Sequence, residues 1–151
     1  MVDVRMTVEE REAFLAKPFV GIISIAHPDA GRAPVAAPIW YDFKPDVGVW
    51  VLTGPKSIKG RALHAAQAFT MAVQEDFLPY RYVSVSGALV EQREAERERD
   101  LRPMAHRYLG EEEGDKYTAT YPDGAFGHVY RMEPRYWLTN DNTKNPALNP
   151  G

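Results

Sequence analysis

The chain has 151 residues, of which 44% are hydrophobic and 26% charged, as is ordinary for one globular domain. A formal net charge of −3 gives no electrostatic reason to expect a nucleic-acid partner, and the absence of cysteine excludes disulfides, thiolate metal sites and cysteine nucleophiles. Because the sequence shows no signal peptide and no apolar run of the roughly 20 residues that span a bilayer, we expect one cytoplasmic domain over residues 1–151 with no membrane partner.

Hydrophobic periodicity and the positions of caps, prolines and glycines divide the chain into short elements, most of them strands. No internal repeat or linker interrupts their order. The predicted elements, in chain order, are a helix at 7–16, strands at 19–26, 33–43 and 47–53, a helix at 58–68, strands at 69–74 and 80–92, helices at 91–100, 103–109 and 111–121, and strands at 126–132 and 135–139.

Local patterns support several of these boundaries. Thr7-Val8-Glu9-Glu10 is a capping box that starts the first helix. Pro34 and Pro38 predict an edge strand or a bulged strand, because proline cannot donate a hydrogen bond to a β-ladder. Gly87 predicts a bulge or a close approach of backbone in the run 80–92. Side chains in that run alternate between two faces: Tyr82, Ser84 and Ser86 on one, and Val83, Val85 and Leu89 on the other.

Six or seven strands with few helices predict an antiparallel barrel, a mainly β fold with peripheral helices. The strand–helix–strand order over 47–74 also permits an α/β sandwich, which we keep as the alternative. The residues from about 141 onward are rich in asparagine and proline, so we expect a loosely ordered tail there.

The turn at 53–61 is the strongest candidate for a ligand site. Ser57 is a good N-cap for the helix that follows. Lys56, Lys59 and Arg61 crowd the helix start, where the helix dipole makes cations mildly unfavourable. A bound anion would explain them, because free N–H groups, a hydroxyl and lysines at a strand-to-helix turn form a phosphate site. The turn is not a P-loop, since no glycine directly precedes the lysine, and a solvated helix start is the alternative.

Other polar residues give weaker signals. The histidines at 27, 64, 106 and 128 are too widely spaced for a metal-ligand pair, so no metal site is predicted. We expect the adjacent carboxylates Glu75 and Asp76 to be exposed at a turn, and Glu94–Glu98 to form a solvated helix face. No acid–base pair stands out, so catalytic residues stay unassigned. Aromatic residues predict core or dimer contacts, with stacking on a planar ligand as the alternative: Trp40, Tyr41, Trp50, Tyr80, Tyr82, Tyr136 and Trp137.

Four blocks of sequence carry a family resemblance through their order and spacing. They are Pro38-Ile39-Trp40-Tyr41-Asp42-Phe43, Val49-Trp50-Val51-Leu52-Thr53, Ser57-Ile58-Lys59-Gly60 and Tyr80-Arg81-Tyr82-Val83-Ser84-Val85-Ser86-Gly87. With the opening run FVGIISIA and the closing run PRYWLTND they span about residues 14–141. Together they resemble the flavin-binding split-barrel family of pyridoxamine 5′-phosphate oxidase and its deazaflavin-using relatives.

The resemblance implies a six-stranded antiparallel split β-barrel of the FMN-binding type, working as a homodimer with two cofactor sites at the interface. It implies that the strand at 38–43 lies along the isoalloxazine ring and that Ser57-Ile58-Lys59 matches the phosphate signature. It also implies that Tyr136-Trp137 comes from the partner subunit. The cofactor-binding residues that we expect are Pro38, Ile39, Trp40, Tyr41, Leu52, Thr53, Lys56, Ser57, Ile58, Lys59, Arg61, Tyr82 and Trp137.

The sequence departs from the family pattern at three places. Ile58 replaces the arginine of the phosphate signature, so Lys56 or Arg61 is expected to supply the charge. Tyr82 stands where the family has a strand glutamine, and a phenol cannot copy the paired donor and acceptor of an amide. The Arg-x-His-Asp-Arg segment that holds pyridoxamine in the oxidase is absent. We therefore do not expect pyridoxamine phosphate oxidase activity.

The expected function is an oxidoreductase that transfers a hydride between FMN or an F-420 type deazaflavin and an unidentified small molecule. The sequence does not choose between the two cofactors. The alternative function is a split barrel that carries or sequesters a flavin or a haem without turnover. A cofactor-free structural dimer with a solvated basic turn is a third possibility.

Overall fold

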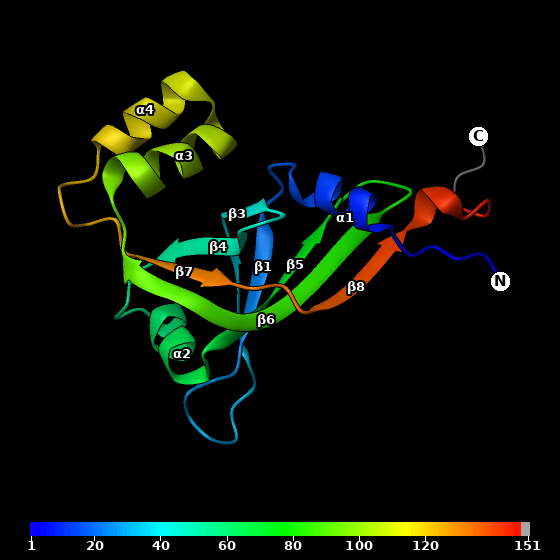
Figure 1. Cartoon of the computed structure of the whole chain (residues 1–151), viewed down its shortest axis with the longest axis horizontal. Coiled ribbons are helices and arrows are strands. Elements are labelled where there is room, and N and C mark those ends of the chain that lie inside the picture. Colours follow the sequence, from blue (N-terminus) through cyan, green and yellow to red (C-terminus); the bar gives the residue numbers. More distant parts are fainter. Residues whose placement is uncertain (149–151) are drawn as a thin grey trace.

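The computed structural model describes residues 1–148 as a curved sheet with helices at its periphery (Figure 1). The helices are α1 (Val8–Leu15), α2 (Ile58–Ala66), α3 (Arg102–Leu109) and α4 (Glu111–Ala119), with a π-helical turn at Arg97–Leu101 and a 3-10 turn at Asn142–Lys144. The strands are β1 (Gly21–Ile25), β2 (Val35–Ile39), β3 (Tyr41–Lys44), β4 (Gly48–Thr53), β5 (Ala68–Gln74), β6 (Arg81–Glu94), β7 (His128–Met132) and β8 (Tyr136–Asp141).

All strand pairs are antiparallel, in the order β2-β1-β5-β6-β7-β4-β3, with β8 paired to β6. The terminal strands β2 and β3 are consecutive in the chain and separated only by Trp40, so the chain itself joins the two ends of the sheet. The described residues form eight strands where six were predicted. Counting β2 and β3 as one bent strand, and leaving β8 outside the closure, reduces eight to six. The predicted barrel is confirmed, and the α/β sandwich alternative is wrong.

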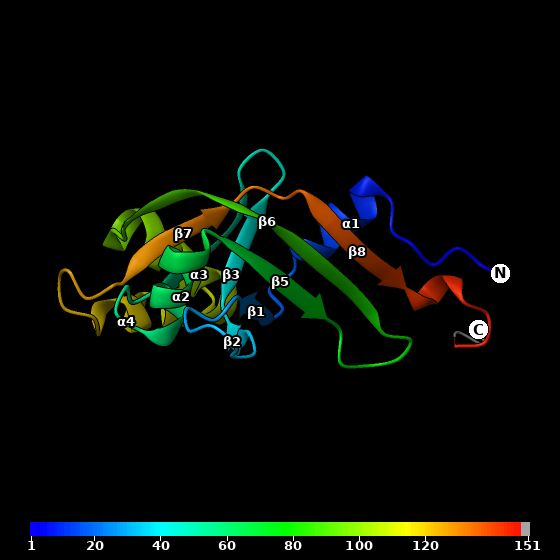
Figure 2. The same cartoon turned by 90° about the horizontal axis from the view of Figure 1, so that it is seen from below.

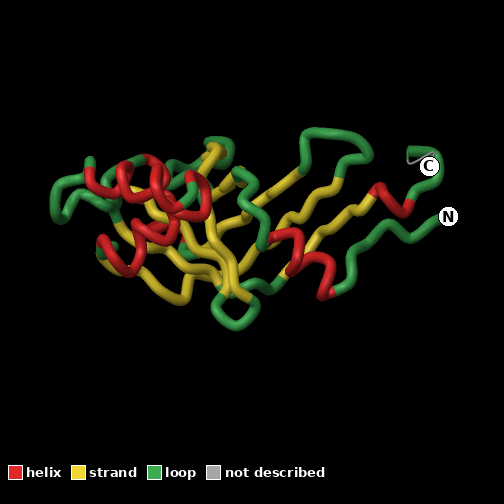
Figure 3. The backbone as a smooth tube through the Cα atoms, turned by 90° about the horizontal axis from the view of Figure 1, so that it is seen from above, coloured by secondary structure: helices red, strands yellow, loops and turns green. Residues whose placement is uncertain are grey.

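The predicted strand at 33–43 is therefore two strands. As expected from its prolines, β2 is an edge, and it pairs only with β1. Because of the break at Trp40, the segment 35–44 contributes β2 to one half of the barrel and β3 to the other. Helices α2, α3 and α4 gather at one end of the strands, and the β5–β6 hairpin extends at the other end (Figures 2 and 3).

The long strand β6 serves both halves of the sheet. Its first part pairs with β5 and β8, and its second part, from Leu89 to Glu94, pairs with β7 with an irregularity between Leu89 and Glu91. Gly87 lies directly against the backbone of Glu133, so a side chain at this position would clash. The close approach of backbone predicted at Gly87 is confirmed.

The helix predicted at 91–100 is wrong at its start, because β6 runs to Glu94. The Glu91 carboxylate accepts hydrogen bonds from the Arg131 guanidinium of β7, so this ion pair links the paired strands β6 and β7.

One face of the half-barrel made by β1, β2, β5, β6 and β8 packs on the core, and the other carries two rows without a charged side chain. The register places its side chains in rows across the strands. One row is Pro38, Ile22, Ala72, Ser84 and Leu138, and the next is Ala36, Ser24, Thr70, Ser86 and Tyr136. Neither row contains a charge, and Ile22, Tyr136 and Leu138 are 42%, 64% and 62% exposed. We call these two rows the uncharged face. The alternation predicted for 80–92 is confirmed here.

The acidic pair at the β5–β6 hairpin corrects a prediction. Glu75 is not exposed at a turn but buried, with 3% of its surface accessible, and its carboxylate accepts two hydrogen bonds from the Arg81 guanidinium. Asp76 is exposed as predicted. The partner lies six residues away on the returning strand, so the hairpin itself brings the two charges together.

Replacing Arg81 with alanine is expected to lower the free energy of unfolding by about 2 kcal/mol, because it leaves a buried carboxylate unpaired. The measurement is the urea midpoint at pH 7. The matched control is Arg5→Ala, which breaks the exposed ion pair with Asp3 and should cost well under about 1 kcal/mol. Equal losses in the two variants would contradict the burial argument.

The termini of the described chain are tied to each other. The backbone N–H of Asp141 donates to Val4, and the Lys144 ammonium donates to the Arg5 carbonyl and the Glu10 carboxylate. The tail predicted from about 141 therefore has contacts over its described part, and residues 149–151 lie outside the described residues. No helix within residues 1–148 is long and apolar enough to cross a membrane.

Candidate functional site

The turn between β4 and α2 is organised by Ser57. This residue is the N-cap of α2: its hydroxyl accepts from the Gly60 N–H at 3.0 Å and donates to the Gly54 carbonyl at 2.6 Å. The Thr53 hydroxyl lies 3.3 Å from the Ser57 hydroxyl. A side chain at Gly60 would clash with the backbone of Gly54 and Pro55, so the turn closes tightly over the helix start. The N-cap prediction is confirmed. Because Ser57 already donates within the turn, its role here is to shape the loop.

Two backbone donors at this turn are free. The Ile58 and Lys59 N–H groups, the first two of α2, form no hydrogen bond with any described residue. The cations Lys56, Lys59 and Arg61 make no ion pair within residues 1–148. Three unpaired cations and two unpaired N–H groups at a helix N-terminus favour an anion. The Ile58 side chain is 39% exposed and carries no charge. Ile58 can therefore contact an anion at this turn only through its backbone N–H.

A small cavity of about 220 Å³ is lined by Ile39, Trp40 and Leu52 from the barrel and by aromatic residues near α4. Those aromatic residues are Tyr117, Tyr121 and Phe126. We call this cavity the aromatic pocket. Its lining is connected to the turn through the backbone: Leu52 precedes Thr53 in the chain, and Phe126 precedes Gly127, which lies against the Thr53 backbone.

Trp40 is fixed by the helical hairpin. Its indole stacks on Tyr108 with ring centroids 4.9 Å apart and planes at 7°, and it meets Tyr117 at 5.4 Å. The Tyr108 hydroxyl accepts from the Tyr41 N–H at 3.1 Å, which satisfies the backbone just after the break between β2 and β3. Burial raises the pKa of the Tyr108 phenol, so it stays protonated at neutral pH and can also donate to a backbone carbonyl.

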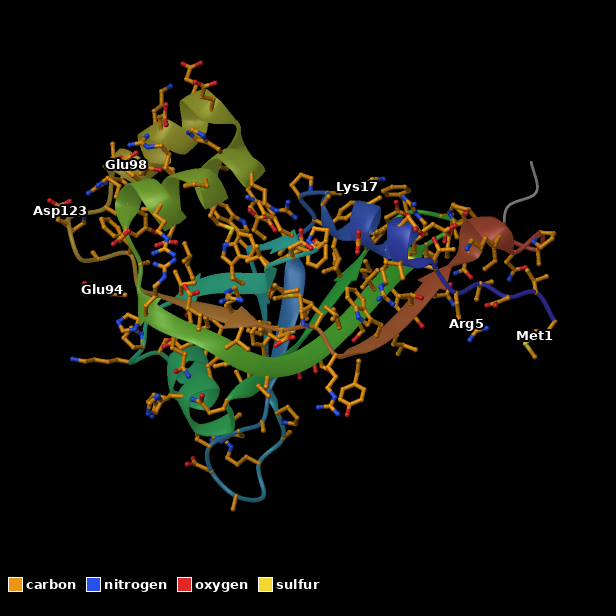
Figure 4. All side chains as sticks on the ribbon, in the orientation of Figure 1. Met1, Arg5, Lys17, Glu94, Glu98 and Asp123 are labelled. Atoms are coloured by element: carbon orange, nitrogen blue, oxygen red, sulfur yellow. The ribbon has the colours of Figure 1, made fainter. Side chains whose placement is uncertain are left out.

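Arg107 anchors α3 to the barrel. Its guanidinium donates to the carbonyls of Leu15, Ala16 and Lys17 at 2.8–2.9 Å, where α1 ends, and lies 3.2 Å from the Asp42 carboxylate. Cations at a helix C-terminus satisfy the last carbonyls and the dipole. The α3–α4 hairpin is thereby held over the strands, and side chains fill the space between the hairpin and β3 and β4 (Figure 4).

Solved structures with the same fold share little sequence with this chain, and no family model and no curated protein matches it. The conserved hypothetical protein Rv2991 from Mycobacterium tuberculosis superposes with a TM-score of 0.75 at 22% identity, covering 95% of this chain and 90% of that one. An F420 reductase gives 0.69 at 22%, covering 84% and 94%. A putative pyridoxamine 5′-phosphate oxidase from Listeria innocua gives 0.65 at 14%, covering 87% and 95%. The chain has the split-barrel fold of these proteins.

The same split barrel also occurs in a haem storage protein. HutZ from Vibrio cholerae superposes with a TM-score of 0.60 at 15% identity, covering 88% of this chain and 94% of that one. The fold alone therefore does not distinguish between flavin-type and haem-type ligands. That distinction depends on the chemistry of the residues at the site of this chain.

Within the split barrel, the predicted site residues fall into separate places. One set surrounds β4: the turn residues Thr53, Lys56, Ser57, Ile58, Lys59 and Arg61, with Ile39, Trp40 and Leu52 at the aromatic pocket. Pro38 and Tyr82 instead line a different hollow, an open groove of about 770 Å³.

Tyr41 and Trp137 lie apart from both places. The Tyr41 side chain is fully buried, its hydroxyl donates to the Leu15 carbonyl at 3.0 Å, and burial raises its pKa. Its backbone N–H is already bonded to Tyr108. Trp137 packs edge-on against Phe43, with the Arg11 guanidinium 3.9 Å above its ring. Both side chains thus have partners in their own subunit.

Sequence reasoning missed the aromatic residues that α3 and α4 bring to the barrel. Tyr117 and Tyr121 are four residues apart, a spacing that puts two side chains on the same face of a helix, and that signal was available. Tyr108 carried no comparable signal, because its role depends on the break at Trp40 in a distant strand.

Proposed function

We propose that this protein is a homodimeric oxidoreductase that binds FMN or an F-420 type deazaflavin and transfers a hydride to or from a small molecule. One observation carries the proposal: a turn with unpaired cations and free N–H groups follows β4 directly, and Leu52 near the end of β4 lines an aromatic pocket. A phosphate attached to a planar ring system needs these two environments side by side.

The chain's own residues bind and orient the cofactor. Lys59 and the N–H groups of Ile58 and Lys59 would hold the phosphate, with Thr53 beside them and Lys56 and Arg61 adding charge. Ile39, Trp40 and Leu52 would border the ring system. The bound cofactor supplies the hydride chemistry, so the protein needs no strong acid or base at the site.

The uncharged face supports the homodimer. Its two rows expose Pro38, Ile22, Leu138 and Tyr136 with no charged side chain among them, and an uncharged apolar patch of this kind is typical of a protein–protein interface. The open groove of about 770 Å³ lies on the same side of the sheet. A second copy that covered both would bring the partner's residues close to the cofactor strand β2.

The test is a titration of the purified protein with FMN, deazaflavin F-420 and haem, followed by turnover assays with quinone and dye acceptors. The absorption spectrum of the protein as purified is recorded first. Tight flavin or deazaflavin binding with turnover is the expected result. Tight binding of any of the three without turnover on any acceptor would instead support the carrier function, and no binding of any of them would contradict both.

Changing Ile58 to arginine is expected to tighten FMN binding by about tenfold, because it restores a guanidinium at the position where the family signature has one. The 39% exposure of Ile58 gives the longer side chain room. Isothermal titration of both proteins at the same ionic strength measures the change. Ile58→Gln, which lengthens the side chain without charge, is the control. Equal affinities in the arginine and glutamine variants would contradict a phosphate at this turn.

A further inference from the structure

We propose that the chain has a second anion-binding site, lined by the π-helical turn and by strands β3, β4, β6 and β7, and that this site takes a small phosphomonoester whose organic part is a single ring. The site is a cavity of about 200 Å³ whose lining includes four cations: Lys44, Arg93, Arg99 and Arg131. We call this cavity the basic pocket. It shares no residue with the turn between β4 and α2 or with the aromatic pocket, so it is independent of the proposed function.

The two carboxylates of the basic pocket are already bonded to its arginines. The Asp100 carboxylate accepts from both terminal nitrogens of Arg93 at 2.7 Å, and the Glu91 carboxylate accepts from Arg93 and Arg131. Hydrogen bonds from Arg93 lower the pKa of Glu91. Burial alone would raise the pKa of Asp100, but its bonds from Arg93 outweigh that effect and lower it, so both groups are ionised at neutral pH. Four cations against two carboxylates leave two formal positive charges, which match the charge of a phosphomonoester dianion.

Lys44 and Arg99 supply this excess of positive charge. Both side chains are exposed, and neither forms an ion pair within residues 1–148. Glu98, the residue before Arg99, does not neutralise it, because the Glu98 carboxylate accepts two hydrogen bonds from Arg102. The two cations come from different elements and meet only at this pocket, so a bound anion would be their shared partner.

The π-helical turn brings Arg99 to the strands. In this turn the Glu96 carbonyl accepts from an N–H five residues later, and the Asp100 carboxylate accepts from the Glu96 N–H at 2.8 Å. Single π-helical turns are rare and are frequent at functional sites. The ion pair between Arg93 and Asp100 ties the turn to β6, and Arg99 thereby lines the same cavity as Lys44 of β3.

Arg131 provides donors that are already held in place. Its guanidinium donates to the Glu91 carboxylate and to the Val47 carbonyl, and these bonds use three of its five N–H donors. The other two have no partner among the described residues. A guanidinium fixed in this way loses little conformational freedom when it binds a phosphate oxygen, and its fork of donors matches the geometry of a phosphate.

An aromatic ring and a small volume limit the organic part of the ligand. The half-buried Trp50 lies directly across the strands from Arg131 and lines the basic pocket, so its indole can pack on a ring attached to the phosphate. The volume of about 200 Å³ lies below the roughly 300–1,000 Å³ of clefts that bury larger ligands. A phosphate with one ring suits this space better than a nucleotide.

The test is isothermal titration with phenyl phosphate at pH 8, where the ester is a dianion. All proteins carry Lys59→Ala, which weakens phosphate binding at the turn before α2. The added double variant Lys44→Ala/Arg99→Ala is expected to bind phenyl phosphate about tenfold or more weakly, because it removes two charged donors. The matched control is Lys17→Ala/Arg32→Ala, which removes two exposed cations that do not line the pocket and should leave the affinity unchanged.

A second variant tests the ring. Trp50→Leu should lower the affinity for phenyl phosphate to that for inorganic phosphate, and the affinity for inorganic phosphate should stay the same. A loss of both affinities to the same extent would contradict packing of the ligand's ring on the indole.

Three results would overturn the site: no binding of phenyl phosphate in the Lys59→Ala protein, equal binding with and without Lys44→Ala/Arg99→Ala, or an equal loss in the control double variant. The last result would reduce the effect to net charge. FMN and F-420 affinities, measured without Lys59→Ala, should not differ between wild type and Lys44→Ala/Arg99→Ala. A weaker cofactor affinity there would make the basic pocket part of the cofactor site, whereas absent cofactor binding in the wild type would contradict only the proposed function.

Discussion

Replacing Lys59 with alanine is expected to weaken the binding of FMN or F-420 by about 1.5–3 kcal/mol, or about 10- to 150-fold in Kd. The half-buried Lys59 makes no ion pair with a described residue, and its own N–H and that of Ile58 are free beside it. A phosphate bound there would accept from all three donors, and removing the ammonium takes away the charged one. Fluorescence titration at fixed ionic strength measures the change.

Lys17→Ala is the matched control, because Lys17 is an exposed lysine that lies away from α2 (Figure 4). It removes the same formal charge from the protein and should leave the affinity unchanged. Similar losses in both variants would show that only net charge matters, and unchanged affinity in Lys59→Ala would remove the phosphate from this turn. A steep dependence of the wild-type affinity on salt, absent in the variant, would support the assignment further.

The parts of this fold that were predictable from sequence are set by near neighbours. The capping box Thr7–Glu10 and the Ser57 N-cap both form as expected, because each needs only residues three apart. The alternation in β6 and the edge position of β2 follow from residue type in the same way. These local signals do not show how the sheet closes into a barrel. The order of the sequence blocks, through the family resemblance, predicted that closure.

The errors arose where a distant residue decides the structure. Glu91 has helical composition around it, but its charge pairs with Arg131, 40 residues later, and continues the strand. Glu75 sits at a turn, yet Arg81 on the returning strand allows it to be buried. Trp40 ends β2 because Tyr108, from the helical hairpin, takes the backbone N–H that follows. Arg131 and Tyr108 lie too far along the chain to be found from the local sequence, and Arg81 is recognised as a partner only once the hairpin is known.

The candidate site divides in the same manner. Its turn was predictable, since the cap, the cations and the helix start are contiguous. Its aromatic pocket was predicted only on the barrel side, through Ile39, Trp40 and Leu52. The other wall comes from residues of α4 and the loop after it, which are far from β4 in the sequence. Arg107 of α3 holds the helical hairpin in place by its hydrogen bond to the Leu15 carbonyl.

Replacing Ala72 with arginine is expected to dissociate the proposed homodimer. Ala72 is exposed at the centre of the first row of the uncharged face, between Ile22 and Ser84, so the variant should fold as the wild type does. In a two-fold interface the new charge is desolvated and faces its own symmetry copy. Like charges brought together at an interface cost several kcal/mol, so the dimer Kd should rise by about 100-fold or more.

The measurement is sedimentation equilibrium of wild type and variant across a range of concentrations. The wild type should have twice the chain mass of 17.0 kDa and the variant the single-chain mass. The matched control is Ala119→Arg, an exposed alanine on α4, which should stay dimeric. A monomeric wild type at micromolar concentration, or a dimeric Ala72→Arg variant, would contradict an interface on the uncharged face.

The same variant tests whether the interface and the cofactor site are coupled. Ala72 lines the open groove and is not among the residues that line the aromatic pocket or form the turn at Lys59, so the variant leaves the predicted phosphate contacts of its own subunit in place. If the partner completes the cofactor site, Ala72→Arg should weaken FMN or F-420 binding, and the loss should diminish as protein concentration drives the variant back to a dimer. Wild-type affinity in a monomeric variant would show instead that each subunit holds its cofactor alone.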